Sequence, residues 1–270
     1  MSNRPSTAVL SARERRAFVM RKLHSLSGVV PVGLYLVFHL WTNARALQGQ
    51  VVYDQAVTEI AHLPYLLVLE ILGIYIPLLF HALYGIKLAF EARPNVRRYA
   101  YSRNWMYTLQ RASGLVAFAF IAWHVWQFRI QVALGYMHKA DFFPTLCSSL
   151  SSTHAGIPVV ALLYLVGIAA TVFHFANGLY GFCFSWGITV SRRATRIASA
   201  AFGIAGIVLF VISANTVIYF ATGSRLVLST GSAGQLPAVS CRDVGDKAAS
   251  ATDDSPPLAS LPPEESHGAH

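Results

Sequence analysis

The sequence FHFANGLYG at Phe173–Gly181 lies within a long apolar run and places one histidine, His174, where water is excluded. Four residues later, on the same face of a helix, comes Gly178, which has no side chain. The sequence FHALYG repeats the arrangement with His81 and Gly85. A flat porphyrin needs an axial ligand and room for its macrocycle, and a histidine beside a bare patch of helix offers both.

Composition indicates a membrane protein. Of 270 residues, 54% are hydrophobic and only 12% are charged, whereas soluble domains carry roughly 25% charged residues. The net charge of +9 accompanies long apolar runs, which favours membrane topology over nucleic-acid binding. Cys147, Cys183 and Cys241 form no C-x-x-C pattern, which argues against an iron–sulfur cluster, structural zinc or covalently attached haem in this chain. We also expect no cleavable signal peptide, since the first apolar run is long and late.

Five apolar segments are long enough to cross a bilayer as helices, which takes about 20 residues. They are 23–47, 64–92, 104–134, 157–187 and 197–222. The sequence therefore predicts an all-α membrane protein with three parts. These are an N-terminal segment over 1–22, a five-helix transmembrane domain over 23–222 and a disordered tail over 223–270.

Lysine and arginine in the connections predict the orientation. Most of them lie in the N-terminal segment, in 93–111 and around 192–196, so by the positive-inside rule we expect these regions to be cytoplasmic. The connection 135–156 and the tail are then external. Cys147 and Cys241 share that side and can reach each other through the tail, but we expect them to be free thiols.

Four histidines fall inside the apolar segments, at two depths. At about 1.5 Å per residue, His39 and His124 lie about 8–9 Å from the outer ends of their helices. By the same measure, His81 and His174 lie about 24–26 Å from theirs. Pairing by depth gives an outer pair, His39 with His124, and an inner pair, His81 with His174. Two b-type haems stacked across the membrane, each with two histidine ligands, follow from this pairing.

Glycines on the facing helices support this interpretation. Gly28 is eleven residues before His39, at the depth of the inner pair. Gly114 is ten residues before His124, at a similar depth but rotated away by about 80°. The alternatives for each histidine are a hydrogen-bonded packing residue or a proton relay, but intramembrane ionisable groups are usually functional. Zinc is disfavoured, because neither pair brings sulfur or carboxylate ligands.

Other polar residues near the inner ends of the helices are candidates for contacts with haem propionates. Arg21, Ser25 and Arg111 supply the cationic and hydroxyl groups that a propionate needs. For the two arginines, ordinary topological anchoring is the alternative. His24 is expected to meet lipid headgroups, a propionate or a partner subunit rather than iron.

Several motifs resemble a known family. The motifs are RKLHSLSGVVPVGLYLVFHL, LPYLLVLEILGIYIPLLFHALYG, RNWMYTLQRASG with AWHVW, and VFHFANGLYGF with SWGITV. They are similar to the cytochrome b membrane anchor of type B succinate:quinone oxidoreductases. These anchors are the five-helix, di-haem subunits of succinate dehydrogenases and related fumarate reductases. The resemblance covers about 18–220 and implies that the four haem ligands are His39, His81, His124 and His174.

The resemblance also implies the setting of the chain, a bacterial cytoplasmic membrane. The partners would be a flavoprotein carrying FAD and an iron–sulfur protein, both docked on the cytoplasmic side, and a quinone, usually menaquinone, would react near the outer haem. Electrons would pass from the inner to the outer haem and then to the quinone. Some fumarate reductases of this type carry a glutamate two residues before the fourth ligand, where this chain has Val172. Succinate oxidation is therefore the expected direction.

Glu70 is a candidate for proton delivery to the quinone. It lies eleven residues before His81, three turns outward on the same face, and so is expected at the depth of the outer haem, pointing into the bundle. Glu59, Asp54 and His62 would extend a proton path towards external water. The alternative is a protonated glutamate bonded to a neighbouring helix. Two other classes of function stay open for the whole chain: a free-standing transmembrane electron carrier of the b561 type, and a non-redox transporter.

Overall fold

The computed structural model describes residues 11–92, 96–226 and 241. The first ten residues of the predicted N-terminal segment and most of the predicted disordered tail, 227–240 and 242–270, lie outside the described residues. The helices are α1 (Ala12–Val29), α2 (Pro31–Ala44), α3 (Gln50–Ala61), α4 (Leu66–Val68), α5 (Ile76–Glu91), α6 (Ser102–Val125), α7 (Gln131–Ala133), α8 (Phe142–Ser151), α9 (Val159–Ser185) and α10 (Arg192–Thr222). Two π-helical stretches, Leu69–Tyr75 and Trp126–Ile130, join α4 to α5 and α6 to α7.

The five predicted spans are confirmed, and the first and the fifth begin earlier than predicted. Among the described residues, the helices long and apolar enough to cross a membrane are Ala12–Gln48, Leu66–Glu91, Ser102–Ala133, Val159–Ser185 and Arg192–Thr222. The first begins well before the predicted boundary at 23, because Ser11 and Glu14 form a capping box. The Glu14 backbone N–H donates to the Ser11 hydroxyl at 3.3 Å, and the Glu14 carboxylate accepts from the Ser11 N–H at 2.9 Å.

Prolines mark the irregular points of the first two spans. Pro31 begins α2 directly after the break that follows α1, a position where its missing N–H is tolerated. Pro77, which the sequence predicts to kink the second span, lies in the first turn of α5, and the π-helical stretch Leu69–Tyr75 precedes it. The span therefore stays continuous at Pro77, and the change in its backbone hydrogen bonding is a π-helical segment rather than a break.

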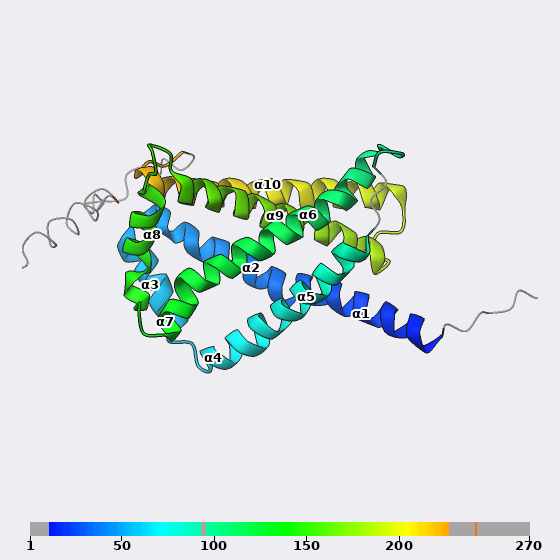
Figure 1. The fold of residues 1–270 in the computed structure, drawn as a ribbon, viewed down its shortest axis with the longest axis horizontal. Coiled ribbons are helices and arrows are strands. Elements are labelled where there is room, and N and C mark those ends of the chain that lie inside the picture. The colour runs from blue at the N-terminus through cyan, green and yellow to red at the C-terminus, as the bar shows by residue number, and fades with distance from the viewer. Residues whose placement is uncertain (1–10, 93–95, 227–240, 242–270) are drawn as a thin grey trace, which may run out of the picture.

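The long helices run roughly along one axis and leave two different ends (Figure 1). α9 packs against α6 and α10, and α1 packs against α5. At one end lie the beginnings of α1, α6 and α10, which carry many arginines; we call this the basic end. At the other, which we call the capped end, α3 and α8 lie across the long helices.

The capped end holds the best-buried core of the described chain. Phe143, Cys147 and Leu150 of α8 are at most 1% exposed, and they join Tyr53 of α3 and Phe220 of α10 in one cluster. α3 and α8 lie in the connections between predicted spans, where the sequence predicts no helix. Each is too short to give a strong periodic signal, and each is stabilised by packing against other segments.

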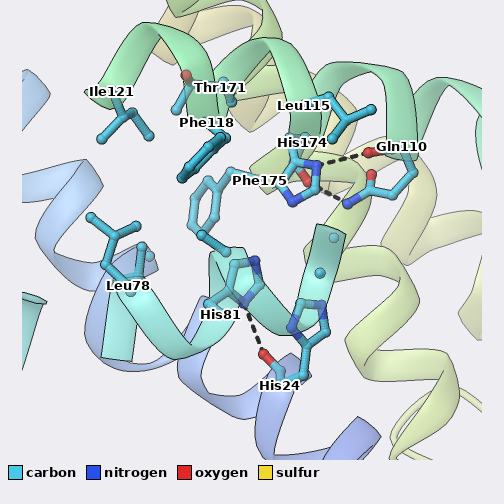
Figure 2. Close-up of a pocket in the computed structure, with 18 of the residues that line it drawn as sticks. His24, Leu78, His81, Gln110, Leu115, Phe118, Ile121, Thr171, His174 and Phe175 are labelled. Atoms are coloured by element: carbon cyan, nitrogen blue, oxygen red, sulfur yellow. Dashed lines mark hydrogen bonds between the residues drawn. The ribbon is translucent and has the colours of Figure 1, made fainter. Parts of the chain in front are cut away.

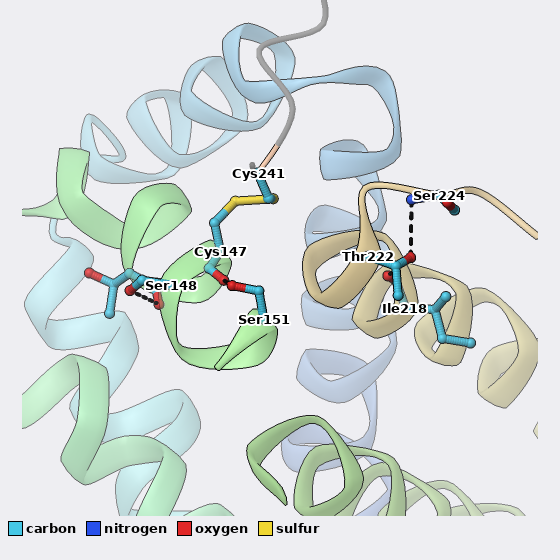
Figure 3. Close-up of a disulfide and its surroundings, with 8 residues drawn as sticks. Cys147, Ser148, Ser151, Ile218, Thr222, Ser224 and Cys241 are labelled. Carbon is cyan, nitrogen blue, oxygen red and sulfur yellow. Dashed lines mark hydrogen bonds between the residues drawn. A yellow bond between two sulfur atoms is a disulfide. The ribbon is translucent and has the colours of Figure 1, made fainter. Parts of the chain in front are cut away.

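A disulfide links this core to the tail, which corrects the expectation of free thiols. Cys147 of α8 is bonded to Cys241, with their Cα atoms 5.2 Å apart and a sequence separation of 94 (Figure 3). Cys241 is only 5% exposed and belongs to the same cluster as Cys147. Tail length alone could not predict this pairing, because it depends on the burial of Cys241 in the α8 cluster.

Candidate cofactor-binding site

The structure brings together the two histidine pairs that the depths predict, from four different spans. The rings of His81 and His174 have centroids 6.0 Å apart and planes at 83°. The rings of His39 and His124 have centroids 5.8 Å apart and planes at 75°. Two metal–imidazole bonds of about 2 Å would separate the ligand nitrogens by about 4 Å, with the ring centroids farther out. Both separations fit one metal ion between the two rings.

A cavity of about 730 Å³ surrounds the inner pair. Helices α1, α2, α5, α6 and α9 line it, and Figure 2 shows His81 and His174 facing each other across it. The walls are largely apolar, with Leu78, Leu115 and Phe118 among the lining residues. Its size lies within the range of about 300–1,000 Å³ that is usual for cofactor sites. The residues present therefore fit a bis-histidine haem.

Backbone carbonyls orient the two inner histidines. The Nδ1 of His81 lies 2.9 Å from the carbonyl oxygen of His24, and the Nδ1 of His174 lies 2.9 Å from that of Gln110. A carbonyl can only accept, so each Nδ1 carries the proton and donates it. The Nε2 lone pair of each ring is then available to a metal.

Glycines make room for these rings rather than only for a macrocycle. A Cβ on Gly28 would lie 2.2 Å from Cε1 of His81, and one on Gly114 would lie 2.8 Å from Cε1 of His174. Gly114 thus faces the inner pair despite its rotation relative to His124.

Gly85 and Gly178 also line the cavity, but their bare faces are not left open as the sequence analysis expected. A Cβ on Gly85 would lie 3.0 Å from the ring of His24, and one on Gly178 would lie 3.4 Å from the Gln110 side chain. A side chain from a neighbouring helix therefore packs against each of these glycines.

Hydroxyl groups orient the outer histidines. The Nδ1 of His124 lies 3.2 Å from the Tyr164 hydroxyl, which donates to Gln127 at 3.1 Å and so accepts from the ring. The Nδ1 of His39 lies 3.4 Å from the hydroxyl of Tyr35, one turn earlier on α2. Sequence analysis missed Tyr164, because it lies 40 residues from His124 and on another helix.

Unpartnered polar atoms gather towards the basic end of the cavity. His24 Nδ1, Arg111 Nε and the Tyr180 hydroxyl are buried without a hydrogen-bond partner, and all three residues line the cavity. Ser25 also lines it, with its hydroxyl accepting from Trp186 Nε1 at 3.0 Å. Donors of this kind suit an anionic group such as a propionate.

His24 and Arg21 are two further candidates from this end. The His24 ring lines the cavity and stacks on His81 with centroids 4.2 Å apart and planes at 10°, which agrees with the expected propionate contact rather than with a headgroup contact. Arg21 is exposed and does not contribute to the cavity wall. Of the predicted propionate partners, Ser25 and Arg111 reach the cavity.

Glu70 forms an ion pair with Arg129, which lies in the third span. Its carboxylate lies 2.7 Å from Arg129 Nη2 and 3.2 Å from Nε, and its side chain is 18% exposed. The eleven-residue spacing to His81 assumed a regular helix, but the π-helical stretch Leu69–Tyr75 intervenes and changes the register.

The other members of the predicted proton path lie on or next to α3. Asp54 is partly buried, and burial raises the pKa of its carboxyl group above the ordinary value. Glu59 and His62 are exposed, with His62 Nδ1 donating to the carbonyl of Thr58 at 2.8 Å. Within the described residues, the hydrogen bonds and ion pairs of Glu70 go to Arg129 and do not reach these three side chains.

Comparison with known proteins identifies the family. Residues 91–214 match the family model described as succinate dehydrogenase/fumarate reductase transmembrane subunit. The succinate dehydrogenase cytochrome b558 subunit of Bacillus subtilis (strain 168) is 41% identical over 184 residues, which cover 68% of this chain and 87% of that protein. With five apolar spans, the chain is a multi-pass protein of the bacterial cytoplasmic membrane. The chain belongs to the family of succinate dehydrogenase and fumarate reductase transmembrane subunits.

Proposed function

We propose that this chain is the di-haem cytochrome b anchor of a succinate dehydrogenase, in which it conducts electrons across the membrane to a quinone. The observation that carries the proposal is the meeting of two histidine pairs from four spans, each with ring centroids about 6 Å apart. His81 and His174 would hold the inner b haem, and His39 and His124 the outer one. When bound, such a haem supplies one-electron chemistry at its iron.

The residues of the chain prepare both sites for this role. Nδ1–H donation to a carbonyl or hydroxyl leaves the Nε2 lone pair of His81, His174 and His124 available to a metal. The Nε2 of His39 lies 3.3 Å from Asn43 Nδ2, a contact that a metal would replace. Apolar walls around the inner pair exclude water, and the unpartnered donors at the basic end would hold propionates. The two pairs lie at different depths, so together they form a path along the bundle.

The proposed partners are a flavoprotein with FAD and an iron–sulfur protein, both docked at the basic end. The name of the Bacillus subtilis relative, a subunit of succinate dehydrogenase, supports this assembly. The proposed orientation places the basic end in the cytoplasm, which agrees with the positive-inside rule. A disulfide at the capped end supports it independently, because disulfides persist outside the reducing cytoplasm.

The proposed electron acceptor is a quinone, menaquinone, near the outer pair. Glu70 is the proposed proton donor to it, with Asp54, Glu59 and His62 leading towards the external side. For this role the Glu70–Arg129 pair would have to open, because a carboxylate held by a guanidinium is not free to exchange protons.

Succinate oxidation is the proposed direction of the reaction. Val172, which stands where some fumarate reductases carry a glutamate, is 3% exposed and belongs to α9, which packs against α10. An apolar side chain in this closed position does not carry protons across the membrane.

The test is a visible absorption spectrum of the complex purified through this chain, combined with a flavin assay. The proposal predicts b-type haem absorbance, bound flavin and quinone reduction by succinate. Haem without flavin would instead identify a free-standing electron carrier of the b561 type. Absence of haem would contradict the proposal and favour the third interpretation, a non-redox transporter.

A further inference from the structure

Two helix turns contact the rings of the inner histidine pair in the same way, each through one carbonyl and one glycine. One runs from His24 to Gly28 on α1, and the other from Gln110 to Gly114 on α6. In each, the carbonyl at the first residue accepts from a histidine Nδ1 on another helix at 2.9 Å. The glycine four residues later lies beneath the same ring. Because i and i+4 share a face of a helix, one turn supplies both contacts.

The two contacts fix different properties of the ring. The hydrogen bond fixes the tautomer and the direction of Nδ1. The glycine sets how closely the ring approaches, since an added Cβ would lie 2.2 Å from His81 or 2.8 Å from His174. Such distances cannot be tolerated without displacing the ring or the helix. Each ring therefore has one orientation, and the two planes meet at 83°.

The outer pair is seated differently. Its Nδ1 atoms meet the tyrosine hydroxyls of Tyr35 and Tyr164, not carbonyls. The geometry of the outer pair is thus set by side chains, and that of the inner pair by backbone and glycine.

We propose that the turns His24–Gly28 and Gln110–Gly114 are the positioning elements of the inner site, setting the angle between its two axial imidazoles. This inference rests on the proposed function, in which the pair ligates one haem. It predicts that the two sites can be perturbed separately, the inner by a methyl group on a glycine and the outer by removal of a hydroxyl.

The test compares four variants of the purified complex: Gly28→Ala, Gly114→Ala, Gly203→Ala and Tyr164→Phe. Gly203 of α10 is the matched control, because it is a helical glycine outside the cavity wall and a Cβ there meets nothing within 4 Å. The readouts are haem content and the electron paramagnetic resonance signals of the oxidised low-spin haems, whose shape depends on the angle between the ligand planes.

We expect Gly28→Ala to shift or abolish the inner signal, Gly114→Ala to do so less severely, and both to retain the outer signal in full. Gly203→Ala should match the parent protein, and Tyr164→Phe should shift only the outer signal. Unchanged inner signals in both the Gly28 and Gly114 variants would overturn the proposal. So would joint loss of both signals in both variants, which would show that the glycines serve the fold as a whole. A parent protein without two haem signals would instead contradict the proposed function.

Discussion

At the residue scale, the Glu70–Arg129 pair connects two spans where each is irregular. Glu70 lies in the π-helical stretch Leu69–Tyr75, and Arg129 lies in Trp126–Ile130, which is also π-helical. Such segments occur in helices chiefly at functional sites, because an extra residue in a turn redirects the neighbouring side chains. Arg129 is 33% exposed, so the pair is partly open to its surroundings.

Replacing Glu70 by glutamine tests its proposed role in protonating the quinone. Glutamine keeps the shape and can still accept from Arg129, but it cannot carry a proton. We expect Glu70→Gln to retain both haems and succinate-to-dye activity and to lose most succinate-to-quinone activity. The structural cost of replacing a charge-assisted hydrogen bond is about 1–3 kcal/mol, so assembly is measured alongside.

Glu91→Gln is the matched control, because its pair with Lys87 spans 3.9 Å and both side chains are mainly exposed. Its quinone activity should equal that of the parent protein. Quinone reduction at the normal rate in Glu70→Gln would leave the ion pair with a structural role only.

The four intramembrane histidines could be paired from sequence because helical rise converts residue number into depth. Their partners could not be predicted in the same way. Tyr164 and the His24 carbonyl reach their histidines from other helices, and the rotation of one helix against another is set by packing. The proton-donor role of Glu70 stays a prediction, but its ion pair with Arg129 could not be foreseen, since the π-helical stretch Leu69–Tyr75 alters the register without a distinct sequence signal.

At the element scale, the capped end depends on α3, α8 and the Cys147–Cys241 disulfide. These short helices bury their apolar faces against the last turns of α10. The spans could be predicted because length and apolarity are local properties of a segment. The capping helices could not, because their burial comes from segments distant in the chain.

Removing the disulfide should lower the stability of this end. A cross-link that closes a loop of 94 residues contributes up to about 4–5 kcal/mol in the chain-entropy model. We expect Cys147→Ser and Cys241→Ser to lower the temperature at which the haem absorbance is lost, and to do so equally. The double variant should add nothing further.

Cys183→Ser provides the control, because Cys183 is free. A reducing agent should lower the melting temperature of the parent protein and leave that of the double variant unchanged. Mass mapping without reduction that found both Cys147 and Cys241 alkylated would exclude the bridge.

At the scale of the whole molecule, the two histidine pairs and the proposed orientation define the direction in which electrons would cross the membrane. Electrons entering at the basic end and leaving at the capped end would move from the cytoplasmic to the external side. A potential negative inside favours that movement by about 2.3 kcal/mol per 100 mV for each electron. This contribution would drive electrons from succinate to a low-potential quinone.

Collapsing the membrane potential should therefore slow succinate oxidation by quinone in intact cells. The rate with an artificial acceptor at the flavoprotein should be unaffected, because those electrons do not cross the membrane. Equal rates with and without an uncoupler, at matched quinone pools, would show that the transfer carries no net charge.

Haem content per chain tests most directly whether each histidine pair holds one haem. The purified parent complex should contain two b haems. His81→Leu and His174→Leu should each lose the inner haem preferentially, and His39→Leu and His124→Leu the outer one, leaving one haem per chain. Retention of two haems in all four variants would contradict the assignment.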